Sequence, residues 1–115
     1  MTNKNLLKIW EKEEKTDFSG WDFSYIKNKC IVERPPWDYL KIAKKLIKNS
    51  KSLLDMGTGG GENFSKLAPF PKYTVAIEGY QPNFPIAKKK LSPLGVKVLQ
   101  MDPSKKLIFK NQEFD

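Results

Sequence analysis

The chain has 115 residues, of which 39% are hydrophobic and 12% aromatic, a length and composition typical of one globular domain. A single cysteine, Cys30, excludes an internal disulfide and is typical of a protein in a reducing cytoplasm. The absence of histidine removes the usual zinc ligand and the commonest general base. We therefore expect no metal partner. No segment approaches the roughly 20 apolar residues of a membrane-spanning helix, so we also expect no membrane partner.

The formal net charge of +8 raises the question of a nucleic-acid partner. Arg34 is the only arginine among 21 basic residues. Arginine is the residue preferred for bidentate contacts to phosphates and bases. We therefore interpret the lysines mainly as solvated helix faces, and nucleic acid is not favoured as a partner.

In chain order, the pattern first predicts an amphipathic helix over residues 4–15, with Leu6, Leu7 and Trp10 on one face. Residues 16–36 are rich in aromatic side chains that are too closely spaced for a helix face. We expect most of these side chains to pack a loop onto the domain.

The next helix is predicted to begin at Pro36, where a missing backbone N–H costs nothing. Its apolar residues follow helical spacing, and Asn49 and Ser50 are expected to close it. Trp37, like Trp10 before it, is interpreted as an anchor in the core.

Strands and helices then alternate along the chain. Short apolar runs predict strands over residues 52–56, 73–78 and 96–101. Helices are predicted between them, over residues 62–68 and from a capping asparagine over residues 83–91. This alternation is typical of a parallel α/β sheet with right-handed crossovers.

The stretch "LLDMGTGGGEN" places several glycines directly after the first predicted strand. Ligands of such sheets bind at the carboxyl ends of the strands. Gly57, Gly59 and Gly61 would let the backbone turn sharply and approach a ligand closely. The predicted helix that follows would direct free N–H groups toward a carboxylate or phosphate.

Two common nucleotide-binding patterns do not fit this loop. The dinucleotide pattern G-x-G-x-x-G would require a third glycine at the position of Glu62, and no Lys-Ser or Lys-Thr follows as in a P-loop. Instead, Asp55 lies two residues before Gly57. A carboxylate at that position suits a cationic ligand better than a pyrophosphate.

Three motifs together, "LLDMGTGGGE", "VAIEGYQPN" and "VLQMD", resemble the cofactor half of a class I S-adenosylmethionine-dependent methyltransferase. The resemblance implies that the glycine loop wraps the methionine part of the cofactor, that Glu78 accepts both ribose hydroxyls, and that Asp102 contacts the adenine amino group. Tyr80 either stacks on the adenine or packs against the protein. The implied cofactor-binding residues are Asp55, Gly57, Thr58, Gly59, Gly61, Glu78, Gly79, Tyr80 and Asp102.

Some of these residues also have a simpler interpretation. Glu78 could be a solvated strand end, and the glycines could form only a tight turn. Asp102 departs from the family pattern, because Pro103 follows it and lacks the N–H that the family often offers to the adenine ring.

The expected fold is therefore α/β, a Rossmann-like parallel sheet of a class I methyltransferase, truncated after the third strand. Residues 1–36 would form a helix and an aromatic lead-in, and residues 37–115 a partial S-adenosylmethionine-binding domain. The family's fourth strand would begin near the last residues. We therefore expect a fragment, or a second copy or complementing chain along the edge of the first strand.

The leading functional hypothesis is the S-adenosylmethionine-binding portion of a methyltransferase, inactive as the isolated chain, with no catalytic residue and no substrate assigned. The alternatives are a non-catalytic module for cofactor binding or association, and a basic RNA-binding part of an RNA methyltransferase.

Overall fold

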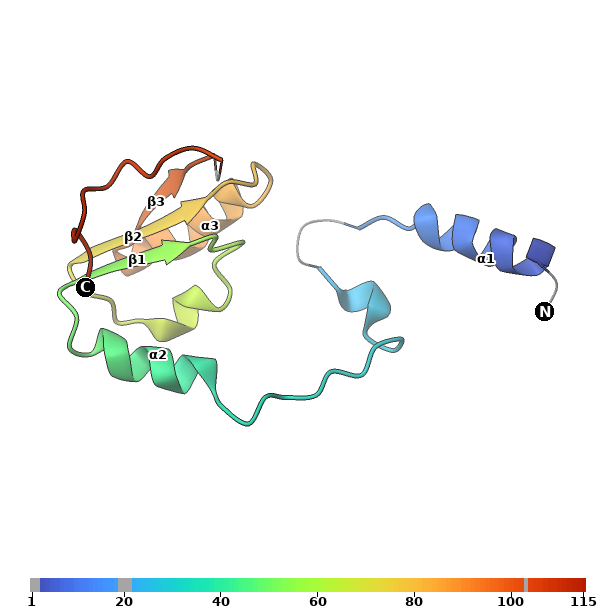
Figure 1. The fold of residues 1–115 in the computed structure, drawn as a ribbon, viewed down its shortest axis with the longest axis horizontal. Coiled ribbons are helices and arrows are strands. Elements are labelled where there is room, and N and C mark those ends of the chain that lie inside the picture. Colours follow the sequence, from blue (N-terminus) through green and yellow to red (C-terminus); the bar gives the residue numbers. More distant parts are fainter. Residues whose placement is uncertain (1–2, 19–21, 103) are drawn as a thin grey trace. The chain divides into compact units, whose positions relative to one another are not determined.

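The computed structural model describes residues 3–18, 22–102 and 104–115. The chain divides into two compact units, Met1–Ile31 and Val32–Asp115, whose elements are labelled in Figure 1. In the described ranges, no helix is long and apolar enough to cross a membrane.

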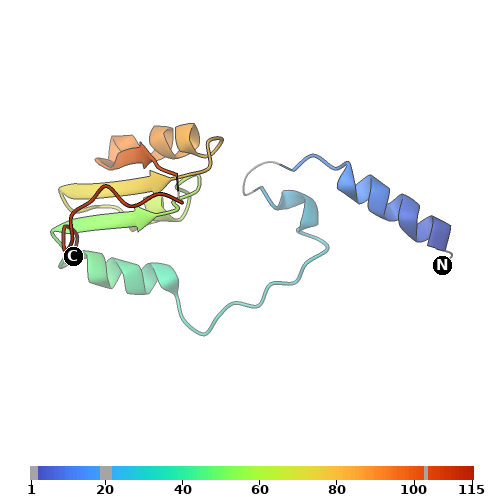
Figure 2. The ribbon, with the colours of Figure 1, turned by 45° about the horizontal axis from the view of Figure 1, so that its top comes forward.

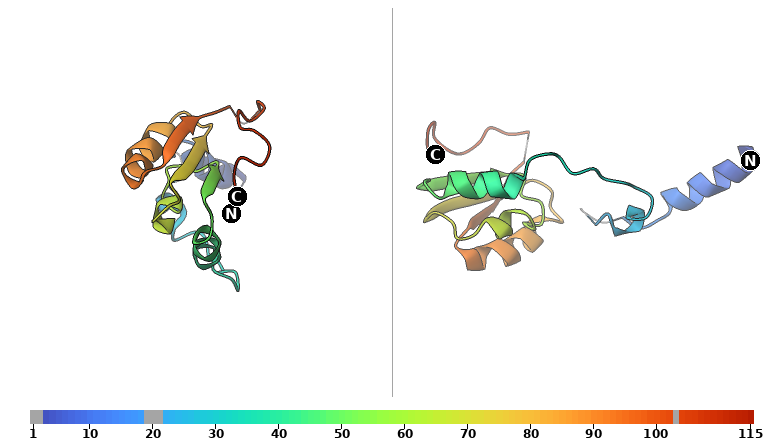
Figure 3. Two further views of the ribbon diagram at one scale, coloured as in Figure 1. Left: turned by 90° about the vertical axis from the view of Figure 1, so that its left-hand side faces the viewer. Right: turned by 90° about the horizontal axis from the view of Figure 1, so that it is seen from below.

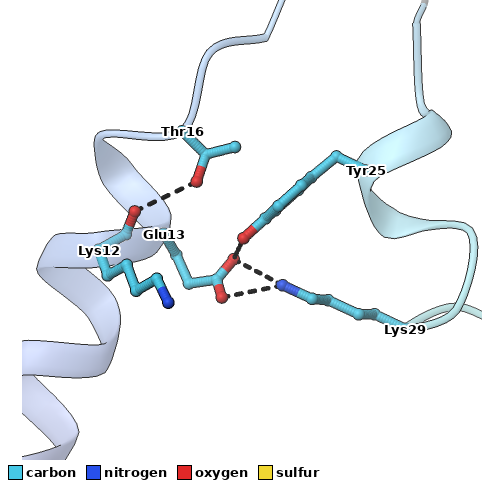
Figure 4. Close-up of polar contacts among 5 residues, drawn as sticks. All are labelled: Lys12, Glu13, Thr16, Tyr25 and Lys29. Carbon is cyan, nitrogen blue, oxygen red and sulfur yellow. Dashed lines mark hydrogen bonds and ion pairs between the residues drawn. The ribbon is translucent and has the colours of Figure 1, made fainter.

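The first unit contains the predicted amphipathic helix, α1 (Asn3–Glu14), and a short 3-10 helix, η1 (Ser24–Ile26). Glu13 on α1 accepts hydrogen bonds from the Tyr25 hydroxyl (2.8 Å) and the Lys29 ammonium (2.8 and 2.9 Å) (Figure 4). The bond from Lys29 is the main cause that lowers the pKa of Glu13. Because α1 buries none of its residues, this exposed polar cluster connects α1 to the segment after it by surface contacts.

Two tryptophans interpreted as core anchors lie at the surface, so that prediction was wrong. Trp10 is 61% exposed on α1, and Trp37 is 58% exposed. Trp37 precedes α2 (Tyr39–Ile47), which begins three residues later than predicted. The reason is Asp38, whose side chain caps the helix by accepting a hydrogen bond from Lys41 N at 3.1 Å. Trp21 lies outside the described residues.

Replacing Asp38 with alanine should destabilise the chain by about 1 kcal/mol, the usual cost of removing a side-chain N-cap. Chemical denaturation followed by circular dichroism would measure this loss. Asp17→Ala, at an exposed position outside the helices, is the matched control. Equal stability of the two variants would contradict the capping role.

The three strands are β1 (Ser52–Met56), β2 (Tyr73–Glu78) and β3 (Lys97–Gln100). They form one sheet in the order β1-β2-β3, and both pairings are parallel (Figures 1 and 2). The first two strands have the predicted bounds, and β3 is one residue shorter at each end. The predicted parallel α/β sheet is confirmed.

Helical segments cover one face of this sheet (Figure 3, left). They are α2, the 3-10 helix η2 (Phe64–Leu67) and α3 (Phe84–Leu91). A further 3-10 turn, η3 (Ser92–Leu94), extends α3. The core between these segments and the sheet consists of Ile47, Phe64, Leu67, Ala76, Ala87, Leu91, Val96 and Val98.

The helix predicted over residues 62–68 is wrong, because only the four-residue 3-10 helix η2 forms there. Pro69 ends the segment after too few residues for a stable α-helix, and Asn63 and Ser65 favour caps and turns over helix interiors. The loop therefore does not lead into an α-helix with an anion-attracting N-terminus. Asn83 does precede α3 as predicted, but its side chain makes no capping hydrogen bond.

After β3 the chain returns over the opposite face of the sheet to the start of β1 (Figure 3, left). The Asp115 carboxylate accepts hydrogen bonds from Lys51 N (2.6 Å) and Ser52 N (2.9 Å). Phe114 stacks on Tyr73, with ring centroids 5.2 Å apart. Among the described residues, β1 has a strand beside it only on the β2 side. The expectation of another chain along its other edge stays a prediction.

Candidate functional site

The glycine loop joins β1 to η2 at the carboxyl end of the sheet. Gly57, Gly59 and Gly61 have φ angles of 74°, 63° and 79°, in the left-handed region that side chains with a Cβ adopt only at a cost. The sharp turn predicted from the glycines is confirmed.

Three consecutive N–H groups attach this loop to the end of β2. Gly57 N and Thr58 N both donate to the Ile77 carbonyl, at 2.9 and 3.1 Å. Gly59 N donates to Glu78 Oε2 at 2.6 Å. These bonds bring the loop and Glu78 together.

Glu78 is only 6% exposed, so the interpretation of a solvated strand end was wrong. Its second oxygen, Oε1, accepts a hydrogen bond from Tyr80 N at 2.7 Å. In the described part of the chain, ion pairs form between other residues and none includes Glu78. The buried carboxylate is therefore stabilised by two charge-assisted bonds from backbone N–H groups.

Asp55 lies on the same face of the sheet as Glu78. It is in register with Ala76, and alternate residues of a strand share a face. Burial is the main cause that raises the pKa of Asp55 above its ordinary value of 3.8, and the charge of Glu78 adds to this shift. Two carboxylates thus lie close together beside the loop.

Thr58 follows Asp55 in the loop, and its side chain lies near the Asp55 carboxylate. Its hydroxyl is near enough to Asp55 to favour the charged carboxylate and so to oppose the rise in pKa. Yet Thr58 Oγ1 is buried and, within the described residues, has no partner at hydrogen-bonding geometry. The contact between this hydroxyl and Asp55 is therefore close but misaligned.

The raised pKa of Asp55 predicts that stability falls as pH rises. The folded state holds a proton at Asp55 that the unfolded state releases above about 3.9, so this contribution is complete below that pH and is lost as pH passes the raised folded pKa. Asp55→Asn should therefore melt at a higher temperature than the wild type at about pH 7. The difference should vanish toward about pH 3, where both side chains are neutral.

Thermal melts across this pH range would measure the effect, with Asp17→Asn as the exposed control. A lower melting temperature for Asp55→Asn at neutral pH would contradict it.

The residues proposed for the adenine lie nearby but are more open. Gly79 is half-buried, and Tyr80 is 55% exposed. Asp102 is exposed, and its carboxylate accepts hydrogen bonds from the Ser104 hydroxyl (2.7 Å) and Ser104 N (2.9 Å). These bonds lower the pKa of Asp102. Met101, the residue before Asp102, donates its N–H to the Glu78 carbonyl at 3.1 Å, which places Asp102 beside the end of β2.

Two features of the site were not predicted. The motifs assigned Glu78 to a ligand and gave no sign of its bonds to Gly59 and Tyr80, which depend on the side-chain conformation. They also gave no reason for Gly61 beyond its backbone angle. In the structure, a Cβ on Gly61 would lie 2.9 Å from Leu91 Cγ, so α3 packs directly against the loop.

No protein-family model matches the chain, and no curated protein matches its sequence. Among solved structures, it is similar to the YcgJ protein of Bacillus subtilis, with 20% identity over 66% of this chain and 34% of that one (TM-score 0.53). A putative methyltransferase from Bacillus halodurans has 25% identity over 66% of this chain and 35% of that one (TM-score 0.51). A dimethyladenosine transferase from Plasmodium falciparum has 23% identity over 70% and 30%, respectively (TM-score 0.50).

The chain thus spans about a third of the length of each of these structures. Its three parallel strands and covering helices match the corresponding part of their folds. The resemblance drawn from the sequence motifs is confirmed at the level of the fold: the chain has the Rossmann-like α/β fold of class I S-adenosylmethionine-dependent methyltransferases.

Proposed function

We propose that this chain binds S-adenosylmethionine at the glycine loop and forms the cofactor-binding portion of a methyltransferase. One observation carries the proposal: Asp55 and Glu78, on adjacent parallel strands, place two carboxylates beside a glycine loop that is held against β2. The putative methyltransferase of Bacillus halodurans, which has the same fold, supports it.

The two carboxylates have different roles in this proposal. Glu78 accepts the two ribose hydroxyls, because each carboxylate oxygen can accept a further hydrogen bond beside the one it already has. Asp55 faces the positively charged part of the cofactor. Burial and the charge of Glu78 disfavour a charged Asp55 in the free protein, so a nearby cation would relieve an unfavourable interaction.

The same charges argue against phosphate-containing cofactors. A pyrophosphate beside the loop would approach two carboxylates, and the three N–H groups of Gly57, Thr58 and Gly59 already have acceptors on β2. Repulsion between like charges in a partly buried site is costly. NAD and ATP are therefore not expected to bind there.

Tyr80 and Asp102 are proposed to lie beside the adenine. The exposed Tyr80 ring is free to stack on it. For Asp102 to accept a hydrogen bond from the adenine amino group, its carboxylate must share or release the hydrogen bonds that it accepts from Ser104.

No base is proposed for the transfer itself. The cofactor supplies an electrophilic methyl group, so the protein contributes mainly alignment and the exclusion of water. No residue of this chain is assigned to the methyl acceptor. We therefore expect cofactor binding without methyl transfer by the chain alone.

Isothermal titration calorimetry with four ligands tests the proposal. S-adenosylmethionine and S-adenosylhomocysteine should each bind with one site per chain, whereas NAD and ATP should give no saturable heat. Glu33→Ala, at an exposed position outside the site, should bind as the wild type does. Equal binding of NAD and S-adenosylhomocysteine would refute the assignment of the cofactor.

A further inference from the structure

We propose that Glu78 is also a positioning residue, whose carboxylate fixes the glycine loop and the turn after β2 before any ligand arrives. Its carboxylate binds Gly59 in the glycine loop and Tyr80 in the turn after β2. Its backbone carbonyl accepts a hydrogen bond from Met101 N after β3, a bond that does not depend on the side chain. We call these two carboxylate bonds, to Gly59 and Tyr80, the Glu78 clamp. Its role in preparing a cofactor site rests on the proposed function, but the clamp itself can be tested without a ligand.

The first half of the loop is held by hydrogen bonds to β2, and no α-helix follows the loop directly. Gly57 and Thr58 donate to the Ile77 carbonyl, and Gly59 continues this series to the Glu78 carboxylate. The segment after the loop is only the short η2. Without Glu78, the bond that holds the middle of the loop is lost.

The clamp is strong because the carboxylate is buried. Glu78 is 6% exposed, and both bonds from N–H groups are short, at 2.6 and 2.7 Å. Charge-assisted hydrogen bonds of this length are stronger than those between neutral groups. A buried carboxylate that loses such donors is left unpaired at high cost.

The clamp and the ribose contact are compatible. An ionised carboxylate offers about four lone-pair sites, and the backbone occupies two of them. Two hydroxyls can therefore bind while Gly59 and Tyr80 stay in place. Fixing the loop and the turn beforehand reduces the conformational entropy that a ligand must overcome.

Substitution by glutamine separates the clamp from a general effect on folding. Glutamine has the same shape as glutamate but only one acceptor oxygen, and its amide nitrogen would face a second donor. Glu78→Gln should therefore retain one of the two bonds, whereas Glu78→Ala should lose both. A general loss of stability would instead expose the amides of the whole sheet.

Amide hydrogen exchange, measured by NMR on the ligand-free full chain, tests how many of the two bonds each variant retains. In the wild type, the amides of Gly59 and Tyr80 should exchange slowly. In Glu78→Ala both should exchange at least about tenfold faster, and in Glu78→Gln only one, because each bond to a charged group is lost separately. The amides of Val75 and Ala76 report on the intact sheet. Glu62→Gln, which alters an exposed ion pair with Lys90, is the matched control.

Rapid exchange of both amides in the wild type would overturn the clamp, and so would wild-type exchange at both positions in Glu78→Gln. If Glu78→Ala does not fold, the wild-type and glutamine measurements still decide. Protected amides together with no binding of S-adenosylhomocysteine would support the clamp and refute the proposed function. Binding of S-adenosylhomocysteine with both amides unprotected would support the proposed function and overturn the clamp.

Discussion

Replacing Gly61 with alanine should lower the free energy of unfolding by about 2–5 kcal/mol, of which about 1–2 kcal/mol is backbone strain and about 1–3 kcal/mol is overpacking. The φ angle of Gly61 is +79°, and an added Cβ would lie 2.9 Å from Leu91 Cγ. Leu91 is fully buried and cannot move aside without disturbing the core. Because a domain is typically stabilised by only about 5–15 kcal/mol, this substitution should remove a large share of the stability.

Gly57→Ala is the matched control for this prediction. Its φ of +74° imposes similar strain, but an added Cβ would meet no atom within 4 Å. It should therefore cost only about 1–2 kcal/mol. Urea denaturation of both variants measures the difference, and equal losses would contradict the contact with α3.

A double-mutant cycle gives a second check. Leu91→Ala alone should cost about 2–5 kcal/mol as a large-to-small core change. In that background Gly61→Ala should cost less than it does alone, because the side chain that it strikes is gone. Strict additivity would show that Gly61 and Leu91 are not coupled.

Glu78→Ala should weaken the binding of S-adenosylhomocysteine at least about 100-fold. Each hydrogen bond to a charged group contributes about 1.5–3 kcal/mol, and two ribose hydroxyls would lose their acceptor at once. The loop would also lose its bond at Gly59. Calorimetric titration of folded protein measures the change.

The control for this variant is Glu62→Ala. Glu62 is adjacent to the loop but exposed, and among the described residues its ion pair is with Lys90 at 3.4 Å, an interaction worth about 0–1 kcal/mol. The affinity of the Glu62→Ala variant for S-adenosylhomocysteine should stay within a fewfold of that of the wild type. Unchanged affinity in Glu78→Ala would show that the ribose assignment is wrong.

The sheet was predictable because its signals are local. The strands over residues 52–56 and 73–78 are short apolar runs between turn residues, and their bounds agree with β1 and β2. The positive φ angles of Gly57, Gly59 and Gly61 likewise follow from local backbone requirements. Alternation with helices then fixes a parallel sheet.

The predictions that were wrong depended on competition or on distant contacts. Asp38 caps α2, so the helix begins at Tyr39 and not at Pro36 as predicted. Pro69 leaves too few residues for an α-helix after the loop. Apolar character suggested that Trp10 and Trp37 belong to the core, but it does not state which surface is available to cover them.

The candidate site shows the same division. The order of Asp55, the glycines and Glu78 in the sequence identifies the end of the sheet where they meet. It does not reveal that Glu78 turns back to bind Gly59, because that bond depends on a buried side-chain conformation. The resemblance assigned Glu78 to a ligand, which stays a prediction, and it gave no sign of the bond from Glu78 to the loop.

The most direct test of the cofactor site is a titration of the ¹⁵N-labelled chain with S-adenosylhomocysteine, followed by amide chemical shifts. We expect saturable shifts concentrated in the loop from Gly57 to Gly61, in the turn from Glu78 to Tyr80 and near Asp102, with α1 and the lysine-rich face of α2 unaffected. Shifts that are absent at saturating ligand, or that occur only outside these three segments, would contradict the site proposed for this protein.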